Sequence, residues 1–155
     1  MFCFDLDMRN NYLTLLAIII INLLIMFALT FVLVFSIGDI FINLNRFYMA
    51  FIMVLSMPIL MLVFMKEMFP NKTVNAVIIT TTIILFLFTF WFIRSQILIG
   101  DKQFLRSMIP HHSGAITMCE RSKITDSEIA DLCDEIVETQ QEEIDQMKDI
   151  YRRMN

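Results

Sequence analysis

The sequence predicts an all-α membrane protein, with three transmembrane helices followed by an αα-hairpin outside the membrane. Two observations favour this class. Hydrophobic residues make up 57% of the 155 residues, and the mean hydropathy is +0.68, more than a soluble domain of this size carries. These residues gather in long runs in the first two thirds of the chain, whereas the last third is polar with apolar residues at helical spacing. We therefore expect a membrane region over 1–96 and a hairpin domain over 97–155.

Three apolar runs predict the transmembrane helices, at residues 13–35, 47–65 and 74–93. Each is long enough to cross a bilayer at about 20 residues per crossing. Asn22 is the one strongly polar residue inside the first run, and we expect it to hydrogen-bond to a neighbouring helix. Pro58 lies in the middle of the second run, where a kink would free a backbone carbonyl. Basic residues divide almost evenly between the two sides, so they do not fix the orientation.

The polar last third predicts two helices folded against each other. The first continues from the third span to about Lys123, and Pro110 either opens a new helix or kinks this one, because proline lacks an N–H. Thr125 and Glu128, three residues apart, form a capping box in which Thr125 is the N-cap of the second helix. The inward face of that helix comprises Ile129, Leu132, Ile136, Gln140, Ile144, Met147 and Tyr151.

Charge and cysteine usage narrow the function. Residues 101–155 hold seven basic and twelve acidic residues, an acidic balance that argues against a nucleic-acid partner. Three scattered cysteines are too few for a disulfide scaffold or a cysteine-based zinc module. The first apolar run is too long for the core of a secretory signal peptide.

The stretch Met108-Ile109-Pro110-His111-His112 holds both histidines of the chain. A thioether and two imidazoles suit copper or zinc, and the sulfur favours copper(I). A hairpin turn at residues 125–126 places His112 opposite Gln140 and Met108 opposite Glu143. Further candidates near this point are Met118, Met147 and Cys119, with Gln140 and Glu143 as ligands or as partners of ligands.

Each of these residues also has an ordinary structural interpretation. The histidines suit a polar helix surface, and Met118 and Met147 suit a packed core. Adjacent helical residues point about 100° apart, so His111 and His112 are not expected to enter one site on a regular helix. The chain lacks the Glu-x-x-His pairs of a diiron centre, and no third group supports Cys119 as a nucleophile. We therefore expect a protein that is not an enzyme.

The second span carries methionine at every fourth position: Met49, Met53, Met57, Met61 and Met65. Residues at this spacing form a ridge that winds slowly round a helix. The ridge suits either a ladder of thioethers for passing a soft cation or flexible packing against the other spans. Both alternatives remain open on the sequence.

The order Asp101-x-x-Phe104-x-x-x-Met108-Ile-Pro-His111-His112-x-x-Ala115-x-x-Met118, followed by Gln140-x-x-Glu143-Ile144-x-x-Met147, resembles a known family. It is the family of domain of unknown function 305, whose characterised members are CopM-like bacterial copper-binding proteins. The motif covers about residues 101–150, and the three-span front is similar to the membrane-anchored branch.

The resemblance implies a ferritin-like half bundle, with Met108, His111, His112, Met118 and Met147 as copper ligands in copper tolerance. It also implies a bacterial cell membrane with the hairpin on the periplasmic or outer side, where Cys119 and Cys133 form a disulfide if their Cα atoms lie within about 7 Å. We expect a homodimer, because two helices alone rarely make a stable core, and its hairpins would form a four-helix bundle. Expected partners are membrane lipid and a copper-handling protein; the alternatives are an assembly subunit of a membrane complex and a metal-responsive sensor.

Overall fold

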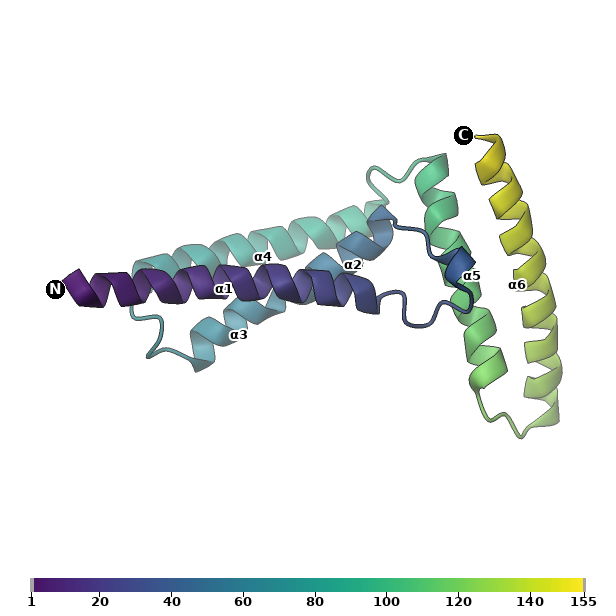
Figure 1. The fold of residues 1–155 in the computed structure, drawn as a ribbon, viewed down its shortest axis with the longest axis horizontal. Helices are drawn as coiled ribbons and strands as arrows, with labels where there is room; N and C mark the ends of the chain where they lie inside the picture. Colours follow the sequence, from purple (N-terminus) through teal and green to yellow (C-terminus); the bar gives the residue numbers. More distant parts are fainter. Residues whose placement is uncertain (1, 155) are drawn as a thin grey trace. The chain divides into compact units, whose positions relative to one another are not determined.

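The computed structural model describes residues 2–154, and side chains from Asn10 onward. No β-strand occurs in that range, which confirms the all-α prediction. In chain order the elements are α1 (Phe2–Leu29), the 3-10 helix η1 (Ile37–Asp39), α2 (Leu44–Val54), α3 (Ser56–Phe64), α4 (Lys72–Ser95), α5 (Asp101–Arg121) and α6 (Ser127–Arg153), as Figure 1 shows.

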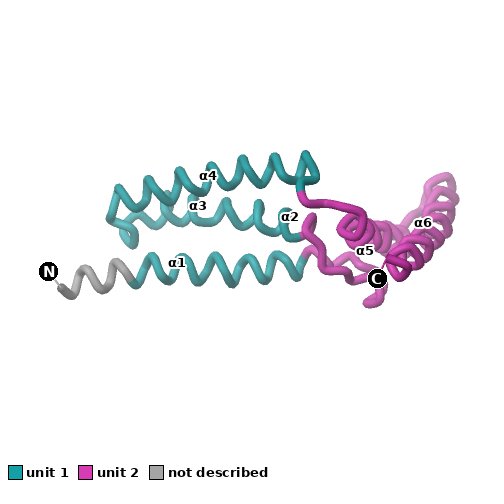
Figure 2. Tube along the Cα trace, turned by 90° about the horizontal axis from the view of Figure 1, so that it is seen from above, with its two compact units in different colours: residues 1–29, 47–97 teal, residues 30–46, 98–155 magenta. Residues whose placement is uncertain are grey.

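The chain divides into two compact units, coloured separately in Figure 2. Unit 1 consists of residues 1–29 and 47–97, and unit 2 of residues 30–46 and 98–155. The second part of unit 2 starts two residues after the predicted boundary at residue 96. Residues 30–46, which the sequence places in the predicted membrane region, pack against the hairpin in unit 2.

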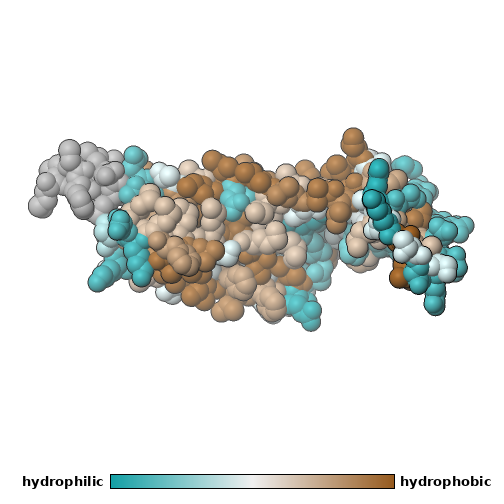
Figure 3. Space-filling view, turned by 90° about the horizontal axis from the view of Figure 1, so that it is seen from below, coloured by the Kyte–Doolittle hydropathy of each residue, from teal (hydrophilic) through white to brown (hydrophobic). Residues whose placement is uncertain are grey.

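Among the described residues, three helical stretches are long and apolar enough to cross a membrane: Asn10–Leu29, Leu44–Phe64 and Lys72–Ser95. They lie in unit 1, except that the second begins with residues 44–46 of unit 2. The buried cluster of unit 1 is small, consisting of Leu15, Leu62 and Phe69. Most of its other large apolar side chains are exposed, and hydrophobic residues cover the helices of unit 1 in Figure 3. An apolar exterior is what a lipid solvent requires of membrane helices.

The first span ends at Leu29 and not at residue 35 as predicted. The twenty residues from Asn10 already match the thickness of a bilayer core of about 30 Å. The apolar residues that follow belong to unit 2 and contact the hairpin: the Phe35 N–H donates to Oγ of Ser113 at 2.9 Å. Hydropathy alone does not distinguish apolar residues that face lipid from those that join a second unit.

The second span breaks at Leu55, three residues before Pro58. Pro58 has no N–H for the carbonyl of Val54, so the helix cannot continue unchanged through this turn. The Ser56 hydroxyl donates to the carbonyl of Met53 at 2.9 Å, which satisfies one carbonyl beside the break. The predicted kink is therefore present.

The break interrupts the methionine row. Met49 and Met53 lie exposed on α2, whereas Met61 packs against the buried cluster of unit 1. Met57 accepts a hydrogen bond from Nδ2 of Asn22 at 3.1 Å, which confirms the predicted contact of Asn22 with another helix. Met65 is the C-cap residue of α3. These methionines thus have different surroundings, and cation passage stays a prediction.

The hairpin of unit 2 is formed by α5 and α6, which lie side by side in Figure 1. Its buried cluster consists of Ile109, Ile116 and Ile144. The third span does not project into α5, because α4 ends at Ser95 and the backbone at Gln96 is left-handed, with φ of 50°. The first hairpin helix therefore starts afresh at Asp101.

The N-cap of α6 is Asp126 and not the predicted Thr125. The Asp126 carboxylate accepts from the N–H groups of Glu128 and Ile129, at 3.0 and 3.1 Å. A carboxylate carries a full negative charge toward the positive end of the helix dipole, which favours it over the neighbouring hydroxyl.

Pro110 lies inside a continuous α5 and does not open a new helix. It leaves the carbonyl of Arg106 without its helical donor, because proline has no N–H. The buried Asn43 donates to this carbonyl through Nδ2 at 3.1 Å. Arg46 donates to the carbonyl of Pro110 itself, also at 3.1 Å. Side chains of the connecting segment 30–46 therefore supply hydrogen-bond donors to carbonyls on this turn of the helix.

One buried carboxylate joins the connecting segment to both hairpin helices. Asp39 is 4% exposed, accepts from the Ser113 hydroxyl of α5 at 2.8 Å and pairs with Lys148 of α6. Phe41 adds apolar cover over the Ile109 cluster and makes an edge contact with Tyr151, with ring centroids 5.4 Å apart. This segment supplies cover that we had expected from a second copy. The homodimer stays a prediction, without that part of its support.

Candidate metal site on the hairpin

A pocket of about 530 Å³ lies in unit 2 against one face of α5. Polar and sulfur-bearing side chains share its wall with apolar ones. The lining residues are Thr30, Leu33, Arg46, Met108, Pro110, His111, His112, Gly114, Ala115, Met118, Ile136 and Gln140. The pocket thus brings together four of the five predicted metal ligands, together with Gln140.

His112 is held between the pocket and α6. Its side chain is 13% exposed, and its buried Nδ1 lies 3.0 Å from Oε2 of Glu143, although not in the direction of a hydrogen bond. Gln140 donates to the same Glu143 oxygen at 3.4 Å. The predicted pairing of His112 with the Gln140–Glu143 part of α6 is therefore correct, within one helical turn.

Burial lowers the pKa of His112 below its ordinary value. The nearby Glu143 carboxylate acts in the opposite direction, and His111 adds a smaller lowering effect. Loss of hydration thus outweighs the carboxylate, so the imidazole is neutral near pH 7. A neutral imidazole has a lone pair for a metal ion, which a protonated one lacks.

Both histidines line the pocket, although we expected that only one could enter a site. His111 is exposed and His112 largely buried, as the 100° step between neighbours predicts. Their ring centroids are nevertheless only 6.1 Å apart, and the pocket is wide enough to reach both. The prediction assumed a site with a single centre, whereas the pocket has a wall broad enough to include both rings.

The methionines divide between the pocket and the core. Met108 is half-buried and Met118 is 60% exposed, and both line the pocket. Met147 does not line it, but packs against the Ile109 cluster. Cys119 is bonded to Cys133, with Cα atoms 5.3 Å apart, so the distance condition stated for this disulfide is met and Cys119 offers no free thiol.

The connecting segment contributes lining residues that the sequence did not indicate. Thr30, Leu33 and Arg46 come from residues 30–46, and the Arg46 guanidinium lies 4.5 Å over the Phe31 ring. Among the residues that the structure describes, no three His, Cys, Asp or Glu side chains gather closely enough to hold a metal ion.

We expect acidification to destabilise the folded protein partly through His112. The unfolded chain has the ordinary pKa of about 6.5 and takes up a proton more readily than the folded chain. The stabilising contribution is present above this value and is lost as the pH falls toward the lower folded pKa. Thermal unfolding in detergent, followed by circular dichroism at pH 7.5 and 5.5, should show a smaller drop in His112→Gln than in the wild type. Equal drops would contradict the assignment of a buried, neutral His112.

The described residues define a class of protein. It is helical, with three membrane-length spans and a disulfide-linked hairpin, and the hairpin packs against the connection between the first and second spans. The family model described as Domain of unknown function (DUF305) matches residues 98–151, and the chain belongs to this family. Uncharacterized protein L153 of Acanthamoeba polyphaga mimivirus is 43% identical over 117 residues, which are 74% of this chain and 75% of that protein. No solved structure matches the chain.

These comparisons confirm the family resemblance. The descriptions of the family and of the mimivirus protein name neither copper binding nor another activity. The similarity to CopM-like members, and the bacterial membrane that it implied, stay predictions.

Proposed function

We propose that the protein is a membrane-anchored copper-binding protein that holds copper(I) at the α5 pocket and is not an enzyme. Met108 and His112 are the principal ligands in this proposal, and His111 and Met118 are further donors on the same wall. Thioether and imidazole together favour copper(I) over hard cations such as magnesium. The hairpin would supply the ligands for copper, and the function would be the storage or transfer of this soft metal.

The observation that carries the proposal is the state of His112. Histidines that ligate metals commonly face a carboxylate with their second nitrogen, which fixes the ring and strengthens the ligand. Nδ1 of His112 lies 3.0 Å from Oε2 of Glu143, where a small rotation of the carboxylate would align this hydrogen bond, and burial lowers the pKa of the ring. The ligand atom would then be Nε2. Glu143 therefore has the role of orienting a ligand and does not itself need to bind the metal.

Arg46 also favours a singly charged metal. Arg46 lines the same pocket, and the repulsion between its positive charge and a divalent cation is about twice that with a monovalent one at equal distance. Zinc and copper(II), which are divalent, would meet this doubled repulsion from Arg46. The pocket thus suits copper(I) better than either.

The disulfide supports an oxidising location for the hairpin. Bonds of this kind persist outside the cytoplasm and are rare in a reducing compartment. We therefore propose that the hairpin lies on the periplasmic or extracellular side, or in an equivalent oxidising compartment. Thioethers and imidazoles remain usable as ligands there.

Copper(I) titration of the full-length protein in detergent, against a competing chelator, tests the proposal. We expect Met108→Leu and His112→Ala each to weaken binding by at least about tenfold, equal to about 1.4 kcal/mol. Leucine nearly matches methionine in volume, so Met108→Leu should still fold. Met147→Leu is the matched control, because Met147 lies in the core and not on the pocket, and its affinity should be unchanged.

The same titration distinguishes the alternatives. An assembly subunit would take up no stoichiometric copper(I), and its Met108→Leu variant would behave as the wild type. A metal-responsive sensor would bind copper and change its oligomeric state on binding. Unchanged affinity in both Met108→Leu and His112→Ala would exclude this site.

A further inference from the structure

The connecting segment has an inverted distribution of polarity. Its polar side chains Asp39 and Asn43 are buried, at 4% and 3% exposure. Most of its large apolar side chains are exposed: Ile37 is 88% exposed, Val32 74% and Ile42 62%. Also among the exposed large hydrophobic residues of this segment are Leu33, Phe35 and Ile40. Six exposed large apolar side chains within one short segment indicate an interaction site, because contact between apolar side chains and water is unfavourable.

The backbone of the segment is satisfied from within unit 2. The N–H groups of Val34, Asp39 and Ile40 donate to carbonyls three residues back, at 2.9–3.2 Å. The N–H groups of Phe35 and Leu44 donate to Ser113 and Gln103 of α5. Irregular backbone enters an apolar environment at low cost only when its polar groups have such partners.

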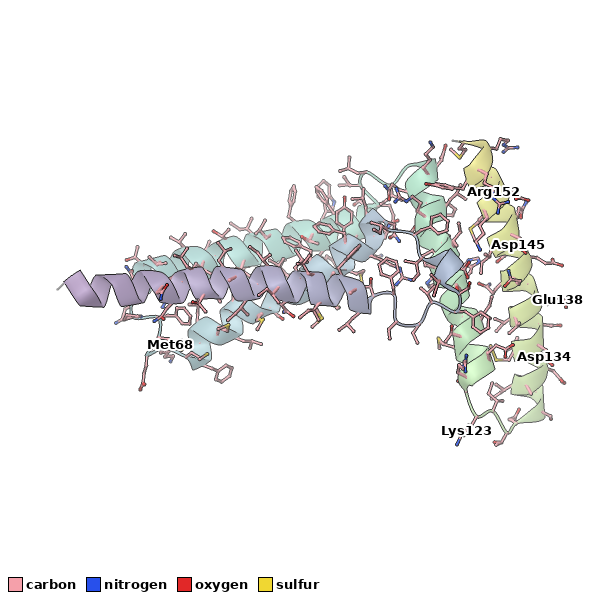
Figure 4. All side chains as sticks on the ribbon, viewed as in Figure 1. Met68, Lys123, Asp134, Glu138, Asp145 and Arg152 are labelled. Carbon is pink, nitrogen blue, oxygen red and sulfur yellow. A yellow bond between two sulfur atoms is a disulfide. The ribbon has the colours of Figure 1, made fainter. Side chains whose placement is uncertain are left out.

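The one charged side chain of the connecting segment between Thr30 and Asn45 is also neutralised. Asp39 is the sole acidic or basic residue between Thr30 and Asn45, and it pairs with Lys148 and the Ser113 hydroxyl on the inner side. A surface facing water would instead expose such a group. The opposite side of the hairpin does so: Figure 4 shows Asp134, Glu138 and Asp145 pointing from α6 away from α5.

We propose that the outer face of residues 30–43 is embedded in the membrane interface, so that lipid covers its exposed apolar side chains. The segment begins one residue after the span that ends at Leu29 and stops where the span Leu44–Phe64 begins. Both of its ends are thus fixed at the membrane by the covalent chain. A bilayer is the apolar partner present at this place whatever the oligomeric state.

This arrangement makes the segment a bridge between lipid and hairpin. Its inner side binds α5 and α6 through Asp39, Asn43 and Phe41, and its outer side lies in lipid. The hairpin is then held at the membrane surface and does not extend freely from it. The inference does not depend on copper binding.

Spin labels on the full-length protein in phosphatidylcholine liposomes test the inference. Single cysteines replace Ile37, Ile42 and, as the control on the charged face, Glu138, in a Cys3→Ser background with the Cys119–Cys133 disulfide intact. The three side chains are exposed, so the substitutions should not disturb packing. Collision with oxygen and with a water-soluble nickel chelate should place the Ile37 and Ile42 labels about 5–10 Å below the headgroup boundary. The Glu138 label should lie in water.

Two results would overturn the inference. Nickel accessibility at Ile37 equal to that at Glu138 would put the face in water. Spin–spin broadening at Ile37 that disappears on dilution with unlabelled protein would show that a second copy covers the face instead. Labels that report lipid at Ile37 and Ile42 and water at Glu138 support it.

Discussion

Asp39→Ala is expected to destabilise unit 2 by about 3 kcal/mol, the largest effect that we expect of any single polar substitution in that unit. The change removes a buried carboxylate that accepts from Ser113 and pairs with Lys148. It leaves an ammonium group and a hydroxyl without their partner. Lys148 is 22% exposed and can turn partly toward water, so the lower end of the range for broken buried pairs applies. Thermal unfolding in detergent measures the loss.

Lys148→Met provides the control for this prediction. Methionine keeps the apolar stem, and in Asp39→Ala/Lys148→Met no buried ammonium remains unpaired. The double variant should therefore be more stable than Asp39→Ala alone. Additive losses from the two single changes would show that the ion pair is not what joins the segment to α6.

Loss of the disulfide is expected to cost about 3 kcal/mol, because the bond closes a loop with a sequence separation of 14 residues. The bond lies near the turn of the hairpin, where α5 and α6 would otherwise separate first. Cys119→Ser and Cys133→Ser should each lower the melting temperature of the hairpin, and a reductant should have the same effect on the wild type. The reductant should have no effect on either variant.

Copper binding gives this prediction a second readout. Neither cysteine is a ligand in our proposal, so Cys133→Ser should keep its copper(I) affinity at a temperature where it is folded. A melting temperature insensitive to reductant would contradict a disulfide in the protein. A large loss of affinity in folded Cys133→Ser would place a cysteine in the site.

The hairpin was predictable because its signals are local. Helical periodicity on both sides of a polar turn fixed the two helices and brought Cys119 opposite Cys133, as the structure has them. The N-cap lies one residue after the predicted one, because the capping-box spacing to Glu128 indicates Thr125 although the adjacent Asp126 is the stronger cap. The hydrogen bond of Asn22 and the helix break near Pro58 were predictable for the same reason. A polar residue or a proline inside an apolar run has few possible structural roles.

The connecting segment was not predictable from such signals. Residues 30–35 are as apolar as the span before them, and nothing in their hydropathy indicates that the helix ends at Leu29. The contacts of Asp39 and Asn43 join residues more than 60 positions apart in the chain. Long-range pairs of this kind depend on how the units fold, and a single sequence carries no pattern for them.

The candidate site was predictable in its residue types and less so in its arrangement. Met108, His111, His112 and Met118 share the pocket because they lie on one stretch of α5. Met147 packs against the Ile109 cluster and does not line the pocket; helical spacing gives its face on α6 but not whether a side chain on that face meets the core or the pocket. Arg46 was missed because it comes from the start of a membrane span.

X-ray absorption at the copper edge of the copper(I)-loaded full-length protein tests the central claim most directly. We expect both sulfur and imidazole nitrogen scatterers in the wild type. The sulfur contribution should decrease in Met108→Leu, the imidazole contribution should decrease in His112→Ala, and both should be unchanged in Met147→Leu. A spectrum with only oxygen or nitrogen scatterers, or one identical in Met108→Leu and the wild type, would contradict a copper site at this pocket.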